Sequence, residues 1–147
     1  VGGCGIFNKR PVISTPKMDS STVQGESMTL TIEIPKRIYA VGEDINLRII
    51  ARNTSDQPIA FASDSSALYK VKMYRNTPLG WRWTNQYPQA AMKVQKTWTL
   101  EPGKTVKYNQ IIPVGRDWPI GETLKLVAEL VGGPDLKCTI MIQAKEK

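Results

Sequence analysis

A repeated alternation of apolar and polar residues constrains the fold of this 147-residue chain more than any other feature. In the run MTLTIEIP, Met28, Leu30, Ile32 and Ile34 alternate with threonine and glutamate. Successive side chains of a strand point to opposite faces, so this run predicts a strand with one face buried against a core. The same alternation returns in the runs INLRIIA, YKVKMY, TLKLVAEL and LKCTIMIQ.

Turn signals separate these runs, as in NTSDQP, NTPLG, EPGKT and VGGPD. About seven to nine short strands joined by such turns predict an all-β fold, an Ig-like antiparallel β-sandwich. The length suits one domain, which we place at residues 27–147. Residues 1–26 are rich in serine, threonine and basic side chains and lack periodicity, so we interpret them as an extended N-terminal tail or tether.

The composition argues against catalysis, because the chain contains no histidine. Histidine is the usual general base and the commonest metal ligand near neutral pH, so we expect no enzyme, no cofactor and no metal site. Cys4 and Cys138 are too few for a zinc site, and Cys138 fits the pattern of a small buried residue. The 20 basic and 13 acidic residues give a charge of +7, but the basic side chains are spread along the strands. We therefore expect a solvated basic surface and no nucleic-acid partner.

The stretch GWRWTNQYPQ carries the candidate binding residues. Trp81 and Trp83 share one side of a strand, and we expect them to face inward as part of the core. The alternative is a large exposed apolar patch, which usually marks a binding site. We expect residues 85–89 to form a loop. The candidate partner-binding residues lie in or near this loop: Pro78, Leu79, Arg82, Asn85, Gln86, Tyr87, Pro88 and Gln89.

Four segments, NTSDQPIAF, YKVKMYRN followed by GWRWTN, TLEPGKTVKYNQ and WPIGETLKLVAEL, follow one another at familiar spacings. Together they resemble the BsuPI-like domain, a family named for a bacterial intracellular proteinase inhibitor, over roughly residues 28–130. The resemblance implies an Ig-like β-sandwich, and founding members are described as inhibitors of an intracellular serine proteinase. The chain departs from the family pattern in the inserted QYPQ, in its long tail and in a further strand at residues 136–143.

The start of the chain, VGGC, resembles the end of a bacterial lipoprotein signal. On this interpretation Cys4 carries a lipid and attaches the protein to a membrane. A chance glycine-rich sequence is the alternative.

These observations predict a non-enzymatic protein-binding module of a bacterial cell-surface or secreted protein, with proteinase inhibition as one version. The alternative is a structural subunit of a surface assembly or filament, in which residues 5–26 dock on a neighbouring copy to form a homo-oligomer. The expected partner is therefore a protease or an assembly neighbour. We expect an extracytoplasmic location, membrane-anchored or secreted, with a cytoplasmic location like that of the founding inhibitor as the alternative.

Overall fold

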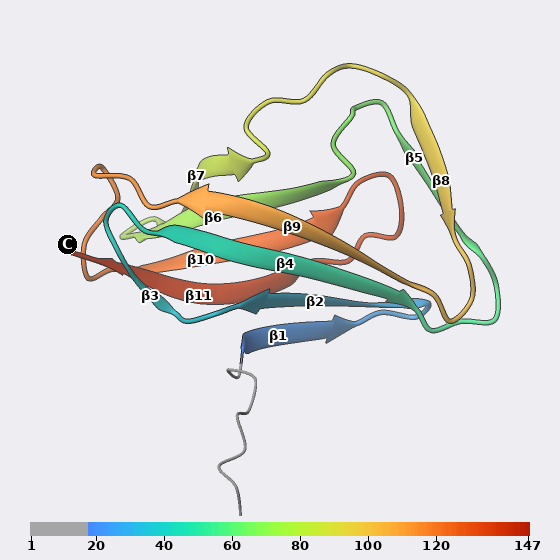
Figure 1. Cartoon of the computed structure of the whole chain (residues 1–147), viewed down its shortest axis with the longest axis horizontal. Helices are drawn as coiled ribbons and strands as arrows, with labels where there is room; N and C mark the ends of the chain where they lie inside the picture. The colour runs from blue at the N-terminus through green and yellow to red at the C-terminus, as the bar shows by residue number, and fades with distance from the viewer. Residues whose placement is uncertain (1–17) are drawn as a thin grey trace, which may run out of the picture.

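The computed structural model describes residues 18–147, and this part of the chain folds as strands joined by turns and loops (Figure 1). In chain order the strands are β1 (Asp19–Gln24), β2 (Met28–Ile34), β3 (Ile38–Ala40), β4 (Asp44–Asn53), β5 (Ile59–Ser63), β6 (Tyr69–Thr77), β7 (Gly80–Tyr87), β8 (Lys96–Leu100), β9 (Thr105–Pro113), β10 (Thr123–Leu130) and β11 (Cys138–Lys145).

Two main sheets form the layers of a β-sandwich. One sheet has the strand order β1-β2-β4-β9, and the other has the order β3-β11-β10-β6-β7. Strands β5 and β8 pair with each other as a two-stranded ribbon at one end of the molecule (Figure 1). Every pair of strands is antiparallel except β3 and β11, which run parallel. The predicted all-β sandwich is thus confirmed, with β1 and β3 as strands that the sequence pattern did not indicate.

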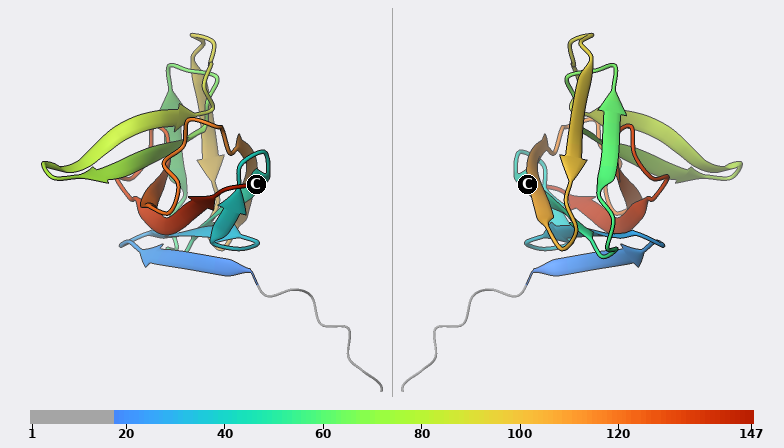
Figure 2. Two further views of the ribbon diagram at one scale, coloured as in Figure 1. Left: turned by 90° about the vertical axis from the view of Figure 1, so that its left-hand side faces the viewer. Right: turned by 90° about the vertical axis from the view of Figure 1, so that its right-hand side faces the viewer.

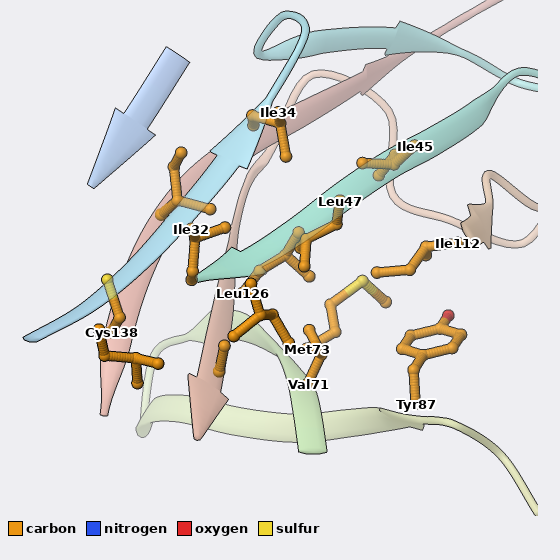
Figure 3. Packing of buried hydrophobic residues seen from close by; sticks show 14 of the residues in the cluster. Ile32, Ile34, Ile45, Leu47, Val71, Met73, Tyr87, Ile112, Leu126 and Cys138 are labelled. Atoms are coloured by element: carbon orange, nitrogen blue, oxygen red, sulfur yellow. The ribbon is translucent and has the colours of Figure 1, made fainter. Parts of the chain in front are cut away.

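The core lies between the two main sheets and is built by the alternating residues of both (Figure 3). Ile32 and Leu47 of the four-stranded sheet are essentially inaccessible to solvent, as are Val71 and Leu126 of the five-stranded sheet. Full burial of one such side chain contributes on the order of 1.5–3 kcal/mol to folding. The inward faces that the alternation predicted for β2, β4, β10 and β11 are therefore the faces that hold the sandwich together.

Part of the segment expected to be a tail belongs to the sandwich. Strand β1 pairs antiparallel with β2, and Val23 lies opposite Leu30. The buried Cys138 of β11 faces this strand and donates a hydrogen bond from Sγ to the Ser21 carbonyl oxygen at 3.0 Å. Residues 1–17, including the lipidation candidate Cys4, lie outside the described residues.

Candidate functional site

The hairpin of β6 and β7 projects from the body of the sandwich (Figure 2). Its root is anchored in the core by the buried side chains of Val71, Met73 and Tyr87. Its turn is held by Thr77, whose Oγ1 donates a hydrogen bond to the Gly80 carbonyl oxygen at 2.7 Å and accepts one from the Leu79 amide at 3.2 Å. The hairpin is therefore fixed both at its root and at its turn. At its tip the Leu79 side chain is 84% exposed.

The two tryptophans of β7 do not enter the core, which corrects the expectation that they face inward. Trp81 is 39% exposed and Trp83 is 58% exposed. The cause is a bulge in the hairpin, where Asn85 lies opposite Met73 but Trp83 lies opposite Tyr74, so that Thr84 is an extra residue. One extra residue reverses the side on which every following side chain lies. The tryptophans consequently share a face, as the alternation predicted, but it is the outer face of the sheet.

The outer face of the hairpin carries a cluster that we call the aromatic face, formed by Tyr74, Trp81, Trp83 and Lys125. The Lys125 Nζ atom lies 4.6 Å from the centroid of the Trp81 ring and 5.1 Å from that of the Tyr74 ring. Such cation–π contacts contribute about 0.5–1 kcal/mol each at exposed sites. They orient the aromatic rings before any partner arrives, so the aromatic face is preorganised.

The other face of the hairpin carries two arginines, Arg75 and Arg82. Arg75 and Arg82 lie opposite each other on neighbouring strands, where like charges repel. Arg75 is compensated by Glu122, to which its Nε and a terminal nitrogen donate hydrogen bonds at 3.1 and 3.0 Å. This carboxylate raises the pKa of the Arg75 guanidinium above its ordinary value. Arg82 is exposed, and no carboxylate of residues 18–147 lies within 4.0 Å of its guanidinium.

Residues 85–89, expected as a binding loop, are mostly not a loop. Strand β7 continues through Tyr87, because Asn85, Gln86 and Tyr87 pair with β6. The Tyr87 ring points into the core beside Met73 (Figure 3). Burial raises the pKa of its phenol, although a hydrogen bond from the Asn85 side chain partly opposes this effect.

The remaining candidates divide between the strand and the turn. Pro88 is half-buried after the strand, and Gln89 is exposed. Pro78 and Leu79 lie in the exposed turn, and Arg82 points away from the two tryptophans. The structure thus brings together Trp81, Trp83, Tyr74 and Lys125, none of which was a candidate, and it places the candidate Leu79 at the exposed tip of the same hairpin. The alternation of the WRW motif was the one signal for this grouping, and the bulge that turns it outward has no such signal.

Other features bearing on function are few in the described part of the chain. Across residues 18–147, aspartate, glutamate and cysteine side chains do not gather in groups of three or more that could hold a metal ion. The same residues include no helix that could span a bilayer. Residues 19–24, which belong to the segment expected to dock on a neighbouring copy, pair with β2 of their own chain.

Comparison with known proteins shows only the fold. No family model matches the chain, and no curated protein matches it. Among solved structures it is similar to the sporulation control protein Spo0M from Bacillus subtilis, with a TM-score of 0.54 and 12% identity over 82% of this chain and 50% of that one. A β-glucosidase from Listeria innocua in complex with laminaribiose gives a TM-score of 0.50 and 10% identity, over 82% of this chain and 16% of the enzyme. The chain therefore spans half the length of Spo0M and about a sixth of the β-glucosidase, and at such identities these likenesses show a shared β-sandwich and nothing about activity.

Proposed function

We propose that this protein is a non-enzymatic protein-binding module of a bacterial cell-surface or secreted protein, and that the β6–β7 hairpin is its binding element. The observation that carries the proposal is the exposure of Leu79, Trp81 and Trp83 together on a hairpin that projects from the sandwich. Exposed apolar clusters of this kind usually mark interaction sites, and tryptophan is among the residues that contribute most to binding energy.

The construction of the hairpin supports a role in binding. Its root packs in the core through Tyr87, and Thr77 braces its turn with two hydrogen bonds. Lys125 holds the Trp81 and Tyr74 rings from the neighbouring strand. A preorganised surface loses less conformational entropy on association, so more of the contact energy appears as affinity. Replacing either tryptophan by alanine is expected to weaken binding about 30-fold, in the range typical of a central aromatic contact.

Proteinase inhibition is the specific version that the BsuPI-like resemblance favours. An inhibitor presents a rigid segment that a protease binds but cleaves poorly, and the braced turn with Leu79 at its tip fits that description. We expect the protein to inhibit at least one subtilisin-like protease, and Leu79→Asp to abolish the effect because the apex would then enter an apolar pocket as a charge. An absence of inhibition at micromolar concentrations across several such enzymes would remove the inhibitor version.

A crosslinking experiment tests the binding element directly, without assuming a protease. A photo-reactive residue replaces Leu79 in bacterial cells that produce the protein, and a matched variant carries it at Ile111, which is 55% exposed on β9 of the other sheet. We expect a discrete crosslinked protein at position 79 and none at position 111. Crosslinks of equal yield at both positions, or none at position 79, would contradict the proposal.

A further inference from the structure

Strand β7 forms one edge of the five-stranded sheet. Within residues 18–147, β6 is its one strand neighbour, so the outward backbone groups along the hairpin have no strand to pair with. An exposed edge of this kind is a template for a further strand, because an extended peptide can satisfy its N–H and C=O groups. The edge lies directly beside Trp81 and Trp83, so a strand added there would also contact the aromatic face.

The hairpin beside this edge is rich in positive charge. Residues 69–87 contain four basic residues, Lys70, Lys72, Arg75 and Arg82, and no aspartate or glutamate. Lys125 of β10 adds a fifth basic residue beside Trp81. Glu122 pairs with Arg75 and Glu129 lies opposite Lys70, whereas Lys72, Arg82 and Lys125 have no carboxylate of residues 18–147 within 4.0 Å. Such a field attracts an acidic partner and speeds its association.

We propose, as a deepening of the protein-binding function above and resting on it, that the partner contributes an acidic extended segment that adds as a strand along β7. The alternation of β7 sets the pattern of that segment. Trp81 and Trp83 lie on one face and Arg82 lies between them on the other, so the residues beside them in the added strand alternate in the same way. The segment therefore carries apolar residues beside the two tryptophans and an acidic residue beside Arg82.

Charge argues against the pairing of this edge with β7, or with residues 1–17, of a second copy. A second copy would bring the same basic hairpin against the first, and like charges opposite each other destabilise a strand pair. Residues 1–17 contain Lys9, Arg10 and Lys17 and no acidic residue, so this segment of a neighbouring copy is also the wrong sign.

The free edge also distinguishes a polypeptide from a lipid bilayer. Leu79 and the tryptophans could enter the apolar part of a membrane, but the unpaired backbone of β7 would enter with them. Backbone groups without partners are strongly disfavoured in hydrocarbon, whereas a polypeptide strand supplies those partners. An acidic strand thus accounts for the charge, the aromatic face and the open edge together.

The test uses the full chain and eight-residue peptides that alternate leucine with glutamate, followed by calorimetry and tryptophan fluorescence. A peptide with lysine in place of glutamate is the charge control. The backbone control is the glutamate peptide with methylated backbone nitrogens on both sides of the strand, so that it cannot donate hydrogen bonds to β7. We expect the glutamate peptide to bind at least tenfold more tightly than either control. Arg82→Glu should reverse the preference between the glutamate and lysine peptides, whereas Arg52→Glu, an exposed position on β4, should retain it.

Other outcomes overturn the inference. Equal binding of the N-methylated peptide would exclude strand addition, and no binding of the glutamate peptide would exclude an acidic segment. Binding of phosphatidylglycerol vesicles or of oligothymidine without binding of the peptide would assign the basic region to a membrane or a nucleic acid. A crosslinked protein at position 79 together with failure of the peptide would leave the protein-binding function standing and remove only this inference.

Discussion

The side chain of Asn53, at the end of β4, is where we expect a substitution to lower the free energy of unfolding strongly. It is fully buried, and its amide nitrogen donates to the carbonyl oxygens of Gln57 at 2.7 Å and Leu100 at 2.8 Å. Its amide oxygen accepts from the backbone N–H of Ser55 at 2.9 Å and from the Ser55 hydroxyl at 2.7 Å. Two donors and two principal acceptor positions are all that an asparagine side chain offers, so every one is used. Asn53 thereby ties the loop after β4 to the end of β8.

Replacing Asn53 by alanine removes these four hydrogen bonds at once. The Leu100 carbonyl is left in a buried setting, where an unsatisfied group costs about 1–3 kcal/mol. The other three partners lie in partly buried or exposed settings and regain water, so each loss costs roughly 0.5 kcal/mol. The sum is about 2.5–4.5 kcal/mol, and at about 3 °C per kcal/mol for a domain of this size it corresponds to a fall in Tm of roughly 8–14 °C.

Urea unfolding and calorimetry of Asn53→Ala measure this loss, with Asn46→Ala as the control. Asn46 lies on the same strand but is exposed, so its replacement should change the free energy of unfolding by less than about 0.5 kcal/mol. A loss of unfolding free energy below about 1 kcal/mol for Asn53→Ala, or an equal loss for Asn46→Ala, would refute this reasoning. The buried hydrogen bonds of Asn53 would then not hold the loop after β4 to β8.

Three further predictions concern a turn and the pH dependence of stability. Gly132 has a φ of 82°, and a Cβ there would clash with the Ala62 carbonyl group, so Gly132→Ala should cost more than about 2 kcal/mol in urea unfolding. Gly42→Ala, at a φ of 95° but in open space, should cost only about 1 kcal/mol, and equal costs would contradict the steric argument. Hydrogen bonds from Lys36 lower the pKa of Glu43 below its usual 4.5, so its contribution to stability is present above that value and is lost as the pH falls through the folded pKa. Glu43→Gln should flatten the acid limb of a Tm-versus-pH curve, and an unchanged limb would contradict this. Burial raises the pKa of four tyrosine phenols. Their contribution to stability is therefore present up to about pH 10 and is lost as the pH rises through the folded pKa values. Absorbance at 295 nm should show these phenols ionising together with alkaline unfolding. These residues are Tyr39, Tyr69, Tyr87 and Tyr108.

Much of the fold could be predicted because, in a strand with one buried face, apolar residues at every second position show which face lies inward. Ile32, Leu47 and Leu126 occupy alternating positions in the sequence, and all three are buried. The pattern of strand β1 gives no such indication, because its residues are mostly polar and none of them is fully buried. Its place in the sheet depends on pairing with β2, a contact between two segments that the period of either one does not reveal.

The candidate site was predictable only in part, for the same reason. The spacing of Trp81 and Trp83 was enough to place them on one side of a strand. Which side faces the core depends on the register with β6, and the bulge at Thr84 reverses it. Tyr87 shows the converse, since a residue expected in an exposed loop lies in the core because β7 continues to it.

The sequence by itself therefore determined the class of the fold and the inward faces of its regular strands. Only the tertiary structure decided that the tryptophans lie outside, that Lys125 of β10 orients the Trp81 ring, and that within residues 18–147 the outer edge of β7 has no strand beside it. The physical reason is that alternation is a local property of each strand, whereas register, bulges and edges are set by the hydrogen bonds between strands.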